Sequence, residues 1–175
     1  ITALLATASK TAAVAALIRV LFMAFAIVKI YWLPVLILLS TLSMIGGNLM
    51  ALRQTNVKRL LAYSSIAQAG YMLIGIIAAD AAGIKGVLFY TLIYIIANIG
   101  AFSVLIAVDK NYGEAEFSTI AGLGQRAPLL AAVLTISLLS MAGIPPMAGF
   151  VGKLYLFTAV VEKGHLLLAF IGFIM

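Results

Sequence analysis

The stretch that decides the fold is Ser137-Leu-Leu-Ser-Met-Ala-Gly-Ile-Pro-Pro-Met-Ala-Gly-Phe-Val-Gly-Lys153-Leu-Tyr-Leu-Phe157. It belongs to an apolar run, residues 129–161, which as a single helix of about 1.5 Å per residue would exceed the roughly 30 Å hydrocarbon core of a bilayer. Gly143, Pro145 and Pro146 interrupt this run. Consecutive prolines remove backbone donors and crowd the preceding turn, so we predict a membrane helix that is broken here.

The predicted break exposes backbone oxygen atoms. We expect the carbonyls of residues 139–141 to lack helical partners, and such carbonyls occur at membrane depth only where they are buried in protein or line a wet cavity. Lys153 follows the break by about two helical turns. A broken membrane helix with a lone lysine is typical of an ion path.

Composition places the chain in a bilayer. Of its 175 residues, 65% are hydrophobic and 9% are charged, and several apolar runs approach the roughly 20 residues that cross a membrane. The predicted fold class is an all-α membrane protein, a polytopic bundle of transmembrane helices with one discontinuous helix. The 11 Lys and Arg residues outnumber the 5 Asp and Glu residues, but they are spread along the chain, which excludes a nucleic-acid-binding face.

The chain has no cysteine and a single histidine, His165. This excludes disulfides and cysteine-ligated iron–sulfur clusters, and one histidine does not by itself build a haem or metal site. We therefore expect no cofactor and no metal in this chain, and we assign any redox chemistry to partner subunits.

Apolar segments divide the chain into successive membrane crossings, the last of them incomplete. The chain begins and ends inside apolar segments, so we interpret it as a piece of a longer protein. We expect a short polar turn at residues 80–85 and the longest polar connection at residues 109–126. The predicted crossings are residues 1–27, 33–52, 58–79, 86–108, 128–161 and 166–175.

Basic residues in the connections indicate an orientation. The side of the membrane with more of them is expected to face the cytoplasm. That side has Arg53, Lys58, Arg59, Lys110 and Arg126, whereas the other side has Lys29, Lys85 and Lys163.

Two lysines, Lys10 and Lys153, fall inside the predicted crossings. A charged side chain near the bilayer centre costs about 2.5–3.5 kcal/mol even on the mildest scale, so such residues normally have a function. A desolvated lysine also takes up and releases a proton more readily near neutral pH, which suits a proton relay. The alternative is structural: either lysine reaches the membrane surface or pairs with an unseen carboxylate.

Uncharged polar residues in the crossings have two interpretations. Ser64, Ser65, Gln68 and Asn98 are candidates for a hydrated proton path. The same residue types also serve as ordinary hydrogen bonds between membrane helices.

Three motifs together resemble a known family. They are Ala6-Thr-Ala-Ser-Lys10, Asn48-Leu-Met-Ala-Leu-Arg-Gln-Thr-Asn-Val-Lys-Arg-Leu-Leu-Ala-Tyr-Ser-Ser-Ile-Ala-Gln-Ala-Gly-Tyr71, and Ala142-Gly-Ile-Pro-Pro-Met-Ala-Gly-Phe-Val-Gly-Lys153. They resemble the antiporter-like membrane subunits of respiratory complex I, and within that family they are most similar to its N-type members, also called subunit 2. The likeness covers essentially the whole chain.

The resemblance implies a fold and two roles. The family has two inverted repeats, each with a broken helix. Residues 1–175 would be one transmembrane domain, with the last helix of the first repeat in residues 1–32 and a truncated second repeat in residues 33–175. Lys10 would be the lysine that links the two half-channels, and Lys153 the lysine from which the proton exits. The family's carboxylate–lysine pair would lie upstream of this chain.

Gln68 departs from the pattern of the family. Several relatives have a histidine at this place, and glutamine does not titrate. Any role of Gln68 in a proton path would therefore be to orient water.

The resemblance also implies partners and a location. We expect a proton-translocating subunit within a hetero-oligomer of antiporter-like and quinone-site membrane subunits, whose partners hold NADH, FMN, iron–sulfur clusters and quinone. The expected location is the bacterial inner membrane, or else an organelle inner membrane. Two other functions remain open: a subunit of a multisubunit Na⁺/H⁺ antiporter or membrane-bound hydrogenase, and a structural scaffold. No buried acid that would suit Na⁺ is visible, which favours protons.

Overall fold

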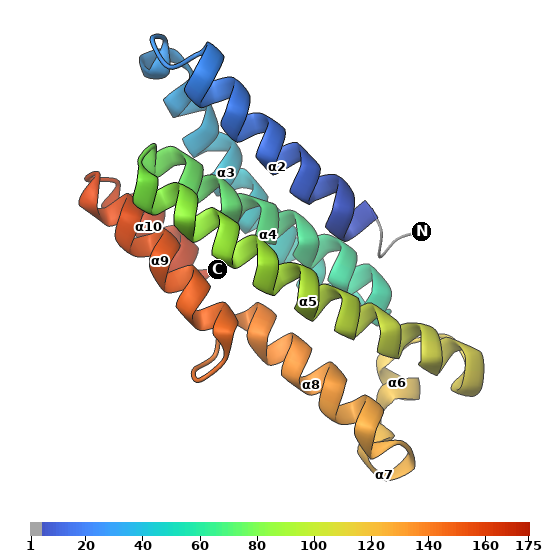
Figure 1. The fold of residues 1–175 in the computed structure, drawn as a ribbon. Coiled ribbons are helices and arrows are strands. Elements are labelled where there is room, and N and C mark those ends of the chain that lie inside the picture. The colour runs from blue at the N-terminus through green and yellow to red at the C-terminus, as the bar shows by residue number, and fades with distance from the viewer. Residues whose placement is uncertain (1–4) are drawn as a thin grey trace.

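The computed structural model describes residues 5–175, and Figure 1 shows them as a bundle of helices. The first helical segment consists of a π-helical turn, an α-helix and a second π-helical turn. A broken helix near the C-terminus is followed by a last short helix. The elements in chain order are η1 (Leu5–Ser9), α2 (Lys10–Arg19), η2 (Val20–Ala24), α3 (Lys29–Leu52), α4 (Val57–Ala78), α5 (Ala81–Tyr112), α6 (Phe117–Ile120), α7 (Leu123–Arg126), α8 (Pro128–Ala142), α9 (Ala148–Glu162) and α10 (Leu166–Ile174).

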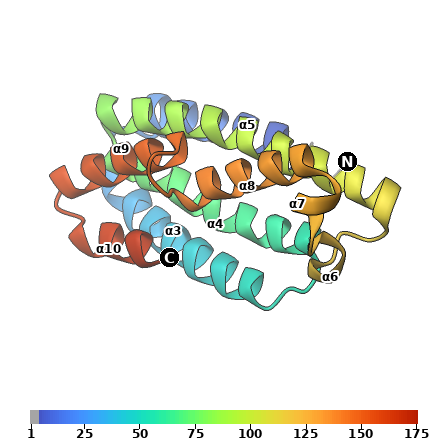
Figure 2. The same ribbon diagram turned by 90° about the horizontal axis from the view of Figure 1, so that it is seen from below.

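Four of the described helices are long and apolar enough to cross a membrane: Thr7–Ala24, Lys29–Leu52, Val57–Ala78 and Ala81–Tyr112. Among them α4 is the most buried: 61% of its apolar stretch is buried, against 11% for Thr7–Ala24. It contacts α2, α3, α5, α9 and α10, and both ribbon views show it in the middle of the bundle (Figures 1 and 2). The chain is thus a multi-pass membrane bundle organised around α4.

Close backbone approach joins α3 to α4. A Cβ atom on Gly47 would lie 2.6 Å from the backbone nitrogen of Ala67, so only glycine fits at this crossing. The start of α3 differs from the prediction, because the helix begins at Lys29 instead of residue 33 and takes Pro34 into its interior.

Helix α5 begins earlier than predicted, and the expected turn at residues 80–85 is wrong. The Asp80 carboxylate accepts a hydrogen bond of 2.7 Å from the backbone N–H of Gly83, which caps the helix so that it starts at Ala81. The helix also continues past residue 108 to Tyr112. The Lys163 ammonium lies 2.9 Å from the Asp80 carboxylate, so an ion pair joins this cap to the turn after α9.

The predicted break in the fifth crossing is confirmed. Helix α8 ends at Ala142, α9 begins at Ala148, and the chain between them turns away from the helix axis (Figure 2). The peptide bond between Pro145 and Pro146 is cis. The two halves together form one crossing with a gap in its backbone hydrogen bonding.

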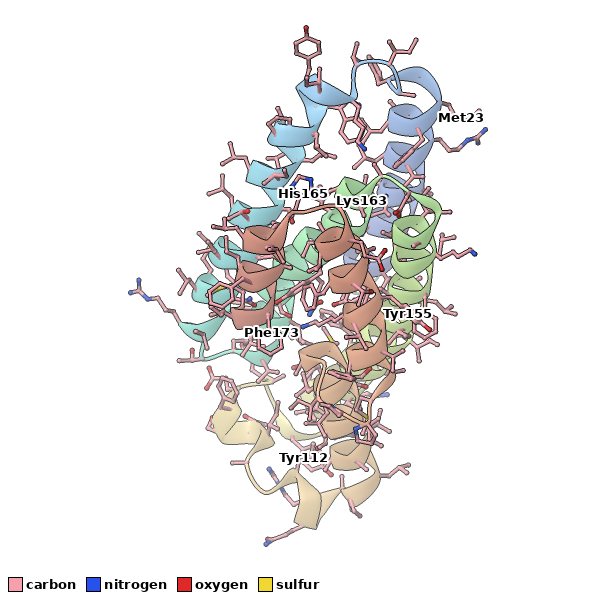
Figure 3. All side chains as sticks on the ribbon, turned by 90° about the vertical axis from the view of Figure 1, so that its left-hand side faces the viewer. Met23, Tyr112, Tyr155, Lys163, His165 and Phe173 are labelled. Atoms are coloured by element: carbon pink, nitrogen blue, oxygen red, sulfur yellow. The ribbon has the colours of Figure 1, made fainter. Side chains whose placement is uncertain are left out.

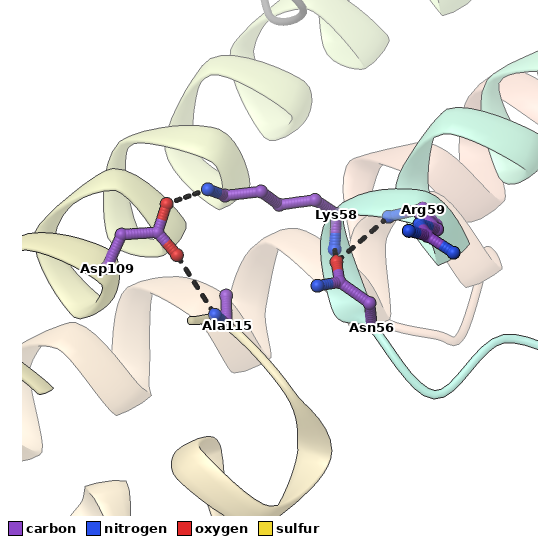
Figure 4. Close-up of polar contacts among 5 residues, drawn as sticks. All are labelled: Asn56, Lys58, Arg59, Asp109 and Ala115. Atoms are coloured by element: carbon purple, nitrogen blue, oxygen red, sulfur yellow. Dashed lines mark hydrogen bonds and ion pairs between the residues drawn. The ribbon is translucent and has the colours of Figure 1, made fainter. Parts of the chain in front are cut away.

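A polar clasp closes the end of the bundle where α4 begins. The residues of this clasp are Asn56, Lys58, Asp109, Ala115 and Glu116. Lys58 forms an ion pair with Asp109, whose other carboxylate oxygen accepts a hydrogen bond of 2.9 Å from the Ala115 N–H (Figure 4). Asn56 pairs with Glu116 across an antiparallel bridge. The clasp joins the α3–α4 turn to the connection after α5.

The connection at residues 109–126 is partly helical, which the sequence did not predict. It holds the last turn of α5 and the short helices α6 and α7. Figure 3 places Tyr112 at this end and both Lys163 and His165 at the opposite end. The two predicted groups of basic connections therefore lie at opposite ends of the bundle.

Candidate functional site: the helix break and two lysines

Backbone N–H groups just after α8 cap the C-terminal end of this helix. Gly143 adopts a left-handed conformation (φ +79°), and its N–H donates to the carbonyls of Leu139 and Ser140, each at 3.1 Å. The Ile144 N–H also reaches Leu139, again at 3.1 Å. This arrangement is a common helix ending, and glycine favours it because no Cβ opposes the positive φ. The expectation that these two carbonyls are free is therefore wrong.

The next two carbonyls of α8 accept hydrogen bonds from side chains instead. The Gln68 amide nitrogen lies 3.3 Å from the Met141 carbonyl, and the Lys153 amine lies 3.1 Å from the Ala142 carbonyl. In a continuous helix both oxygens would bind backbone N–H groups four residues on. The break thus supplies the oxygen atoms to which Gln68 and Lys153 bind.

Gly143 also makes room for Lys153. A Cβ at residue 143 would lie 2.9 Å from Cδ and 3.6 Å from Nζ of Lys153. The lysine side chain crosses over this residue on its way back from α9 to Ala142, consistent with the tilt of helical side chains towards the N-terminus.

Lys153 faces a cavity of about 310 Å³ between α3, α4, α8 and α9. Its amine lies 4.2 Å from the centre of the Tyr71 ring. The cavity has polar groups but no carboxylate among its lining residues, which are Asn48, Leu60, Leu61, Ser64, Gln68, Tyr71, Leu138, Met141, Ala142, Lys153 and Met175. Lys153 is half-buried, so it is less enclosed within residues 5–175 than its position in a crossing suggested.

Gln68 connects three helices. Its side chain is 5% exposed. The Tyr90 hydroxyl of α5 donates a hydrogen bond to the Gln68 side-chain oxygen, while the Gln68 nitrogen donates to Met141 of α8. With both amide atoms engaged, the orientation of Gln68 is fixed relative to the break.

Lys10 contacts α4 about one turn before Gln68. Its amine donates to the Ser65 carbonyl. The Ser65 hydroxyl donates to the Ala62 carbonyl at 2.6 Å, and the Ser65 and Tyr94 side chains are hydrogen-bonded. Lys10 is also half-buried, and no charged side chain in the part of the chain that the structure describes is fully buried.

Helix α4 sets the depth of both amines. Ser65 lies eight residues after Val57 and Tyr71 lies seven residues before Ala78, the two ends of the helix. At about 1.5 Å per residue, Ser65 and Tyr71 are about 12 Å and about 10 Å from the nearer helix end and about 9 Å apart along the axis. Lys10 and Lys153 therefore both contact the middle part of α4, on either side of Gln68.

Asn98 lies apart from this line of contacts. It is completely buried on α5, and neither of its side-chain amide atoms has a hydrogen-bond partner among the described residues. The buried Thr91 hydroxyl likewise has no hydrogen-bond partner among the described residues. Buried polar groups of this kind normally bind ordered water. A place for Asn98 in a proton path stays a prediction.

Two aromatic residues at the site were missed in the sequence. Tyr71 lies three residues after Gln68, hence on the same face of α4, and that spacing was a usable signal. No signal in the sequence pointed to Tyr90, because its contact with Gln68 joins two helices whose relative rotation the sequence does not specify. In residues 5–175 no group of three or more His, Cys, Asp or Glu side chains could hold a metal ion.

A multi-pass helix bundle with a broken helix, a lysine at the break and a second lysine that binds the central helix from α2 is typical of an antiporter-like membrane protein. Comparison with known families agrees. The chain belongs to the transmembrane family described as NADH:quinone oxidoreductase/Mrp antiporter, which matches residues 1–175.

Individual members of this family show which proteins the chain is similar to. The chain is 53% identical over its whole length to NADH-quinone oxidoreductase subunit N of Heliobacterium modesticaldum, and it spans 37% of that protein. It resembles a chain of respiratory complex I from Thermus thermophilus, with a TM-score of 0.71 and 36% identity over 81% of this chain and 32% of that one. It also resembles a chain of the Mrp complex from Dietzia, with a TM-score of 0.86 and 30% identity over 91% and 30%.

Proposed function

We propose that this chain is part of a proton-translocating membrane subunit of an NADH–quinone oxidoreductase, in which Lys10 and Lys153 exchange protons. The observation that supports this most is the line of contacts on α4. Ser65 binds Lys10, Gln68 binds the break, and Tyr71 lies against Lys153. Similarity to subunit N supports the assignment to an oxidoreductase over other members of the family.

The chemistry proposed for this line is proton transfer through lysines and water. Each lysine amine donates a hydrogen bond to a backbone carbonyl. A carbonyl accepts such a bond but has no proton to transfer. The cavity beside Lys153 has room for several water molecules, with Ser64 and Gln68 on its wall. Water there would pass a proton between the amines, and Gln68 would only orient that water.

The wider assembly is part of the same proposal. Residues 1–32 would end the first of two inverted repeats, and residues 33–175 would belong to the second. Partner membrane subunits would complete the proton path, and partners that hold NADH, FMN, iron–sulfur clusters and quinone would supply the electron transfer. The membrane would be a bacterial inner membrane.

The test is Lys153→Ala in the full-length subunit within its assembled complex. We expect the complex to assemble, and its proton pumping to fall several-fold, because the break loses its only titratable amine. The matched control is Lys85→Ala, which removes an exposed lysine at the start of α5. A normally assembled complex with unchanged pumping would instead favour the scaffold.

A Na⁺/H⁺ antiporter subunit is the second candidate. It is favoured by the TM-score of 0.86 to a chain of the Mrp complex from Dietzia, which exceeds the 0.71 for complex I from Thermus thermophilus. Radioactive Na⁺ uptake by proteoliposomes that hold the complex separates the two. Na⁺ movement in exchange for protons would support the antiporter, and proton movement that is indifferent to Na⁺ would support the oxidoreductase.

A further inference from the structure

The environment of Lys153 poses a physical question, which is how its positive charge is stabilised at membrane depth. The residues that line its cavity include no Asp or Glu. The two salt bridges of the described residues, Lys58–Asp109 and Lys163–Asp80, lie at the ends of the bundle. An ammonium group with one hydrogen bond to a carbonyl is expected to need a further attractive partner.

The face of the Tyr71 ring is placed to be that partner. The Lys153 amine lies 4.2 Å from the ring centre, well within the range of a cation–π contact. Such contacts attract the charged amine through the negative face of the ring, and they gain strength where water is excluded. Tyr71 is 2% exposed, so bulk water is largely excluded from its ring, which borders the cavity beside Lys153.

The surroundings of Tyr71 hold its ring in this orientation. The rings of Tyr90 and Phe157 pack edge-on against it, with centres 6.5 Å and 6.2 Å away. Asn48 of α3 lies beside Tyr71 in the lining of the same cavity. A ring that is clamped by α3, α5 and α9 presents a constant face to the amine, without an entropic cost when the amine becomes charged.

We infer that Tyr71 is a positioning residue that stabilises the ammonium form of Lys153 through its ring and thereby sets the pH range over which Lys153 relays protons. This inference rests on the function proposed above and deepens it. Tyr71 holds no proton of the relay. It acts only through Lys153.

Besides the Ala142 carbonyl at the C-terminal end of α8, the described residues place no other charged side chain in the lining of the Lys153 cavity. Helix α9 packs against α4, α5, α8 and α10. Helices α8 and α10 have no titratable side chain, α3 contributes the neutral Asn48, and α5 contributes Tyr90, whose ring lies against Gly152 and whose hydroxyl binds Gln68. Among the described residues it is the Tyr71 ring that contacts the Lys153 amine, whereas the Tyr90 hydroxyl binds Gln68.

The experiment varies the charge attraction of the ring without varying its size. In the full-length subunit within its complex, position 71 receives phenylalanine and then phenylalanines with one, two or three ring fluorines. Fluorine withdraws the negative charge of the ring face but hardly changes the packing. Proton pumping is then measured across a range of pH, with Lys153→Ala and Tyr155→Leu alongside. Tyr155, labelled in Figure 3, is an exposed tyrosine of α9 whose ring contacts Phe89 of α5.

The expected result has a definite sign. Pumping that needs the ammonium form is lost as pH rises, so a weaker ring should move this alkaline limb to lower pH. We expect Tyr71→Phe to keep the limb near its original place, and successive fluorines to move it by a total of roughly 0.5–1 pH unit. Tyr155→Leu should leave the limb unmoved. Tyr71→Leu, which removes the ring, should move it at least as far.

Two outcomes overturn different claims. If Lys153→Ala abolishes pumping but the fluorine series leaves the alkaline limb in place, Tyr71 has only a packing role and this inference is wrong. If Lys153→Ala pumps normally, the proposed function is itself wrong, and the inference about Tyr71 is wrong with it.

Discussion

Gly143 combines a backbone and a side-chain requirement at the break. Its φ of +79° ends α8, and its missing Cβ leaves the path of the Lys153 side chain open. The sequence predicted the break from Gly143, Pro145 and Pro146, because glycine and proline affect the backbone in ways that local chemistry specifies. It did not predict that Gly143 lies beneath Lys153, since that depends on how α9 folds back.

The change Gly143→Ala tests this double role. A left-handed alanine costs about 1–2 kcal/mol, and the added methyl group should also displace the flexible Lys153 side chain from the Ala142 carbonyl. We expect a modest loss of thermal stability and a several-fold loss of proton pumping.

Gly122→Ala is the matched control for Gly143→Ala. Gly122 has a similar φ of +74°, but a Cβ there would meet nothing within 4 Å. Both variants should lose similar stability in thermal unfolding, and only Gly143→Ala should lose pumping. Equal pumping by the two variants would contradict the steric role of Gly143.

At the level of single elements, helix α5 shows how a cap changes a boundary. Residues 80–85 contain a charge at each end and a glycine, which predicted a turn. The Asp80 carboxylate instead accepts a hydrogen bond from Gly83, one of the free N–H groups of the first turn, and α5 starts five residues earlier than expected. Asp followed by helix-compatible residues is a recognisable start signal, and it was available in the sequence.

The cap gives a prediction about pH. The hydrogen bond from the Gly83 N–H, together with the Lys163 ammonium, holds the pKa of the Asp80 carboxyl below its usual value. A lowered pKa stabilises the fold above the ordinary carboxyl pKa, and this contribution disappears as pH falls through the lowered value. Thermal unfolding of the purified full-length chain should therefore show a stability loss below about pH 4 that Asp80→Asn lacks.

Two substitutions separate the cap from the ion pair. Asp80→Ala removes both and should destabilise by about 1 kcal/mol near neutral pH. Asp80→Asn still caps the helix but lacks the charge, and the partly exposed pair with Lys163 is worth little, so its loss should be smaller. Equal losses would mean that the ion pair, and not the cap, fixes the start of α5.

At the scale of the whole molecule, contacts between distant segments assemble both the clasp and the site. Asn56 pairs with Glu116, and Lys10 binds Ser65, over separations along the chain that no local pattern specifies. Hydrophobic length predicted the first four crossings, where the described residues form helices long and apolar enough to span a bilayer. Which faces of the crossings meet depends on side-chain packing, and so the contacts of Gln68 with Tyr90 and Met141 required the structure.

The clasp predicts a small, measurable coupling. Lys58 and Asp109 are 39% and 28% exposed, so a double-mutant cycle with Lys58→Ala and Asp109→Ala should give a coupling free energy of about 0.2–1 kcal/mol. Asp109→Ala should cost more than Lys58→Ala, because it also frees the Ala115 N–H. Thermal unfolding of the full-length chain measures both.

Arg59→Ala serves as the control for the clasp. Arg59 is exposed beside Lys58 and has no ion pair among the described residues. Its removal should leave stability nearly unchanged. A coupling free energy of zero between Lys58 and Asp109 would show that their ion pair does not hold the two connections together.

The interruption between α8 and α9 also creates an electrical pole in the middle of the bundle. Aligned peptide dipoles give the C-terminal end of a helix about half a negative charge, and α8 ends where its Ala142 carbonyl meets Lys153. A dipole end, unlike an aspartate, cannot be neutralised by a proton. The negative potential at this point is therefore constant, and each proton that binds Lys153 changes the local charge by a whole unit that no neighbouring acid shares.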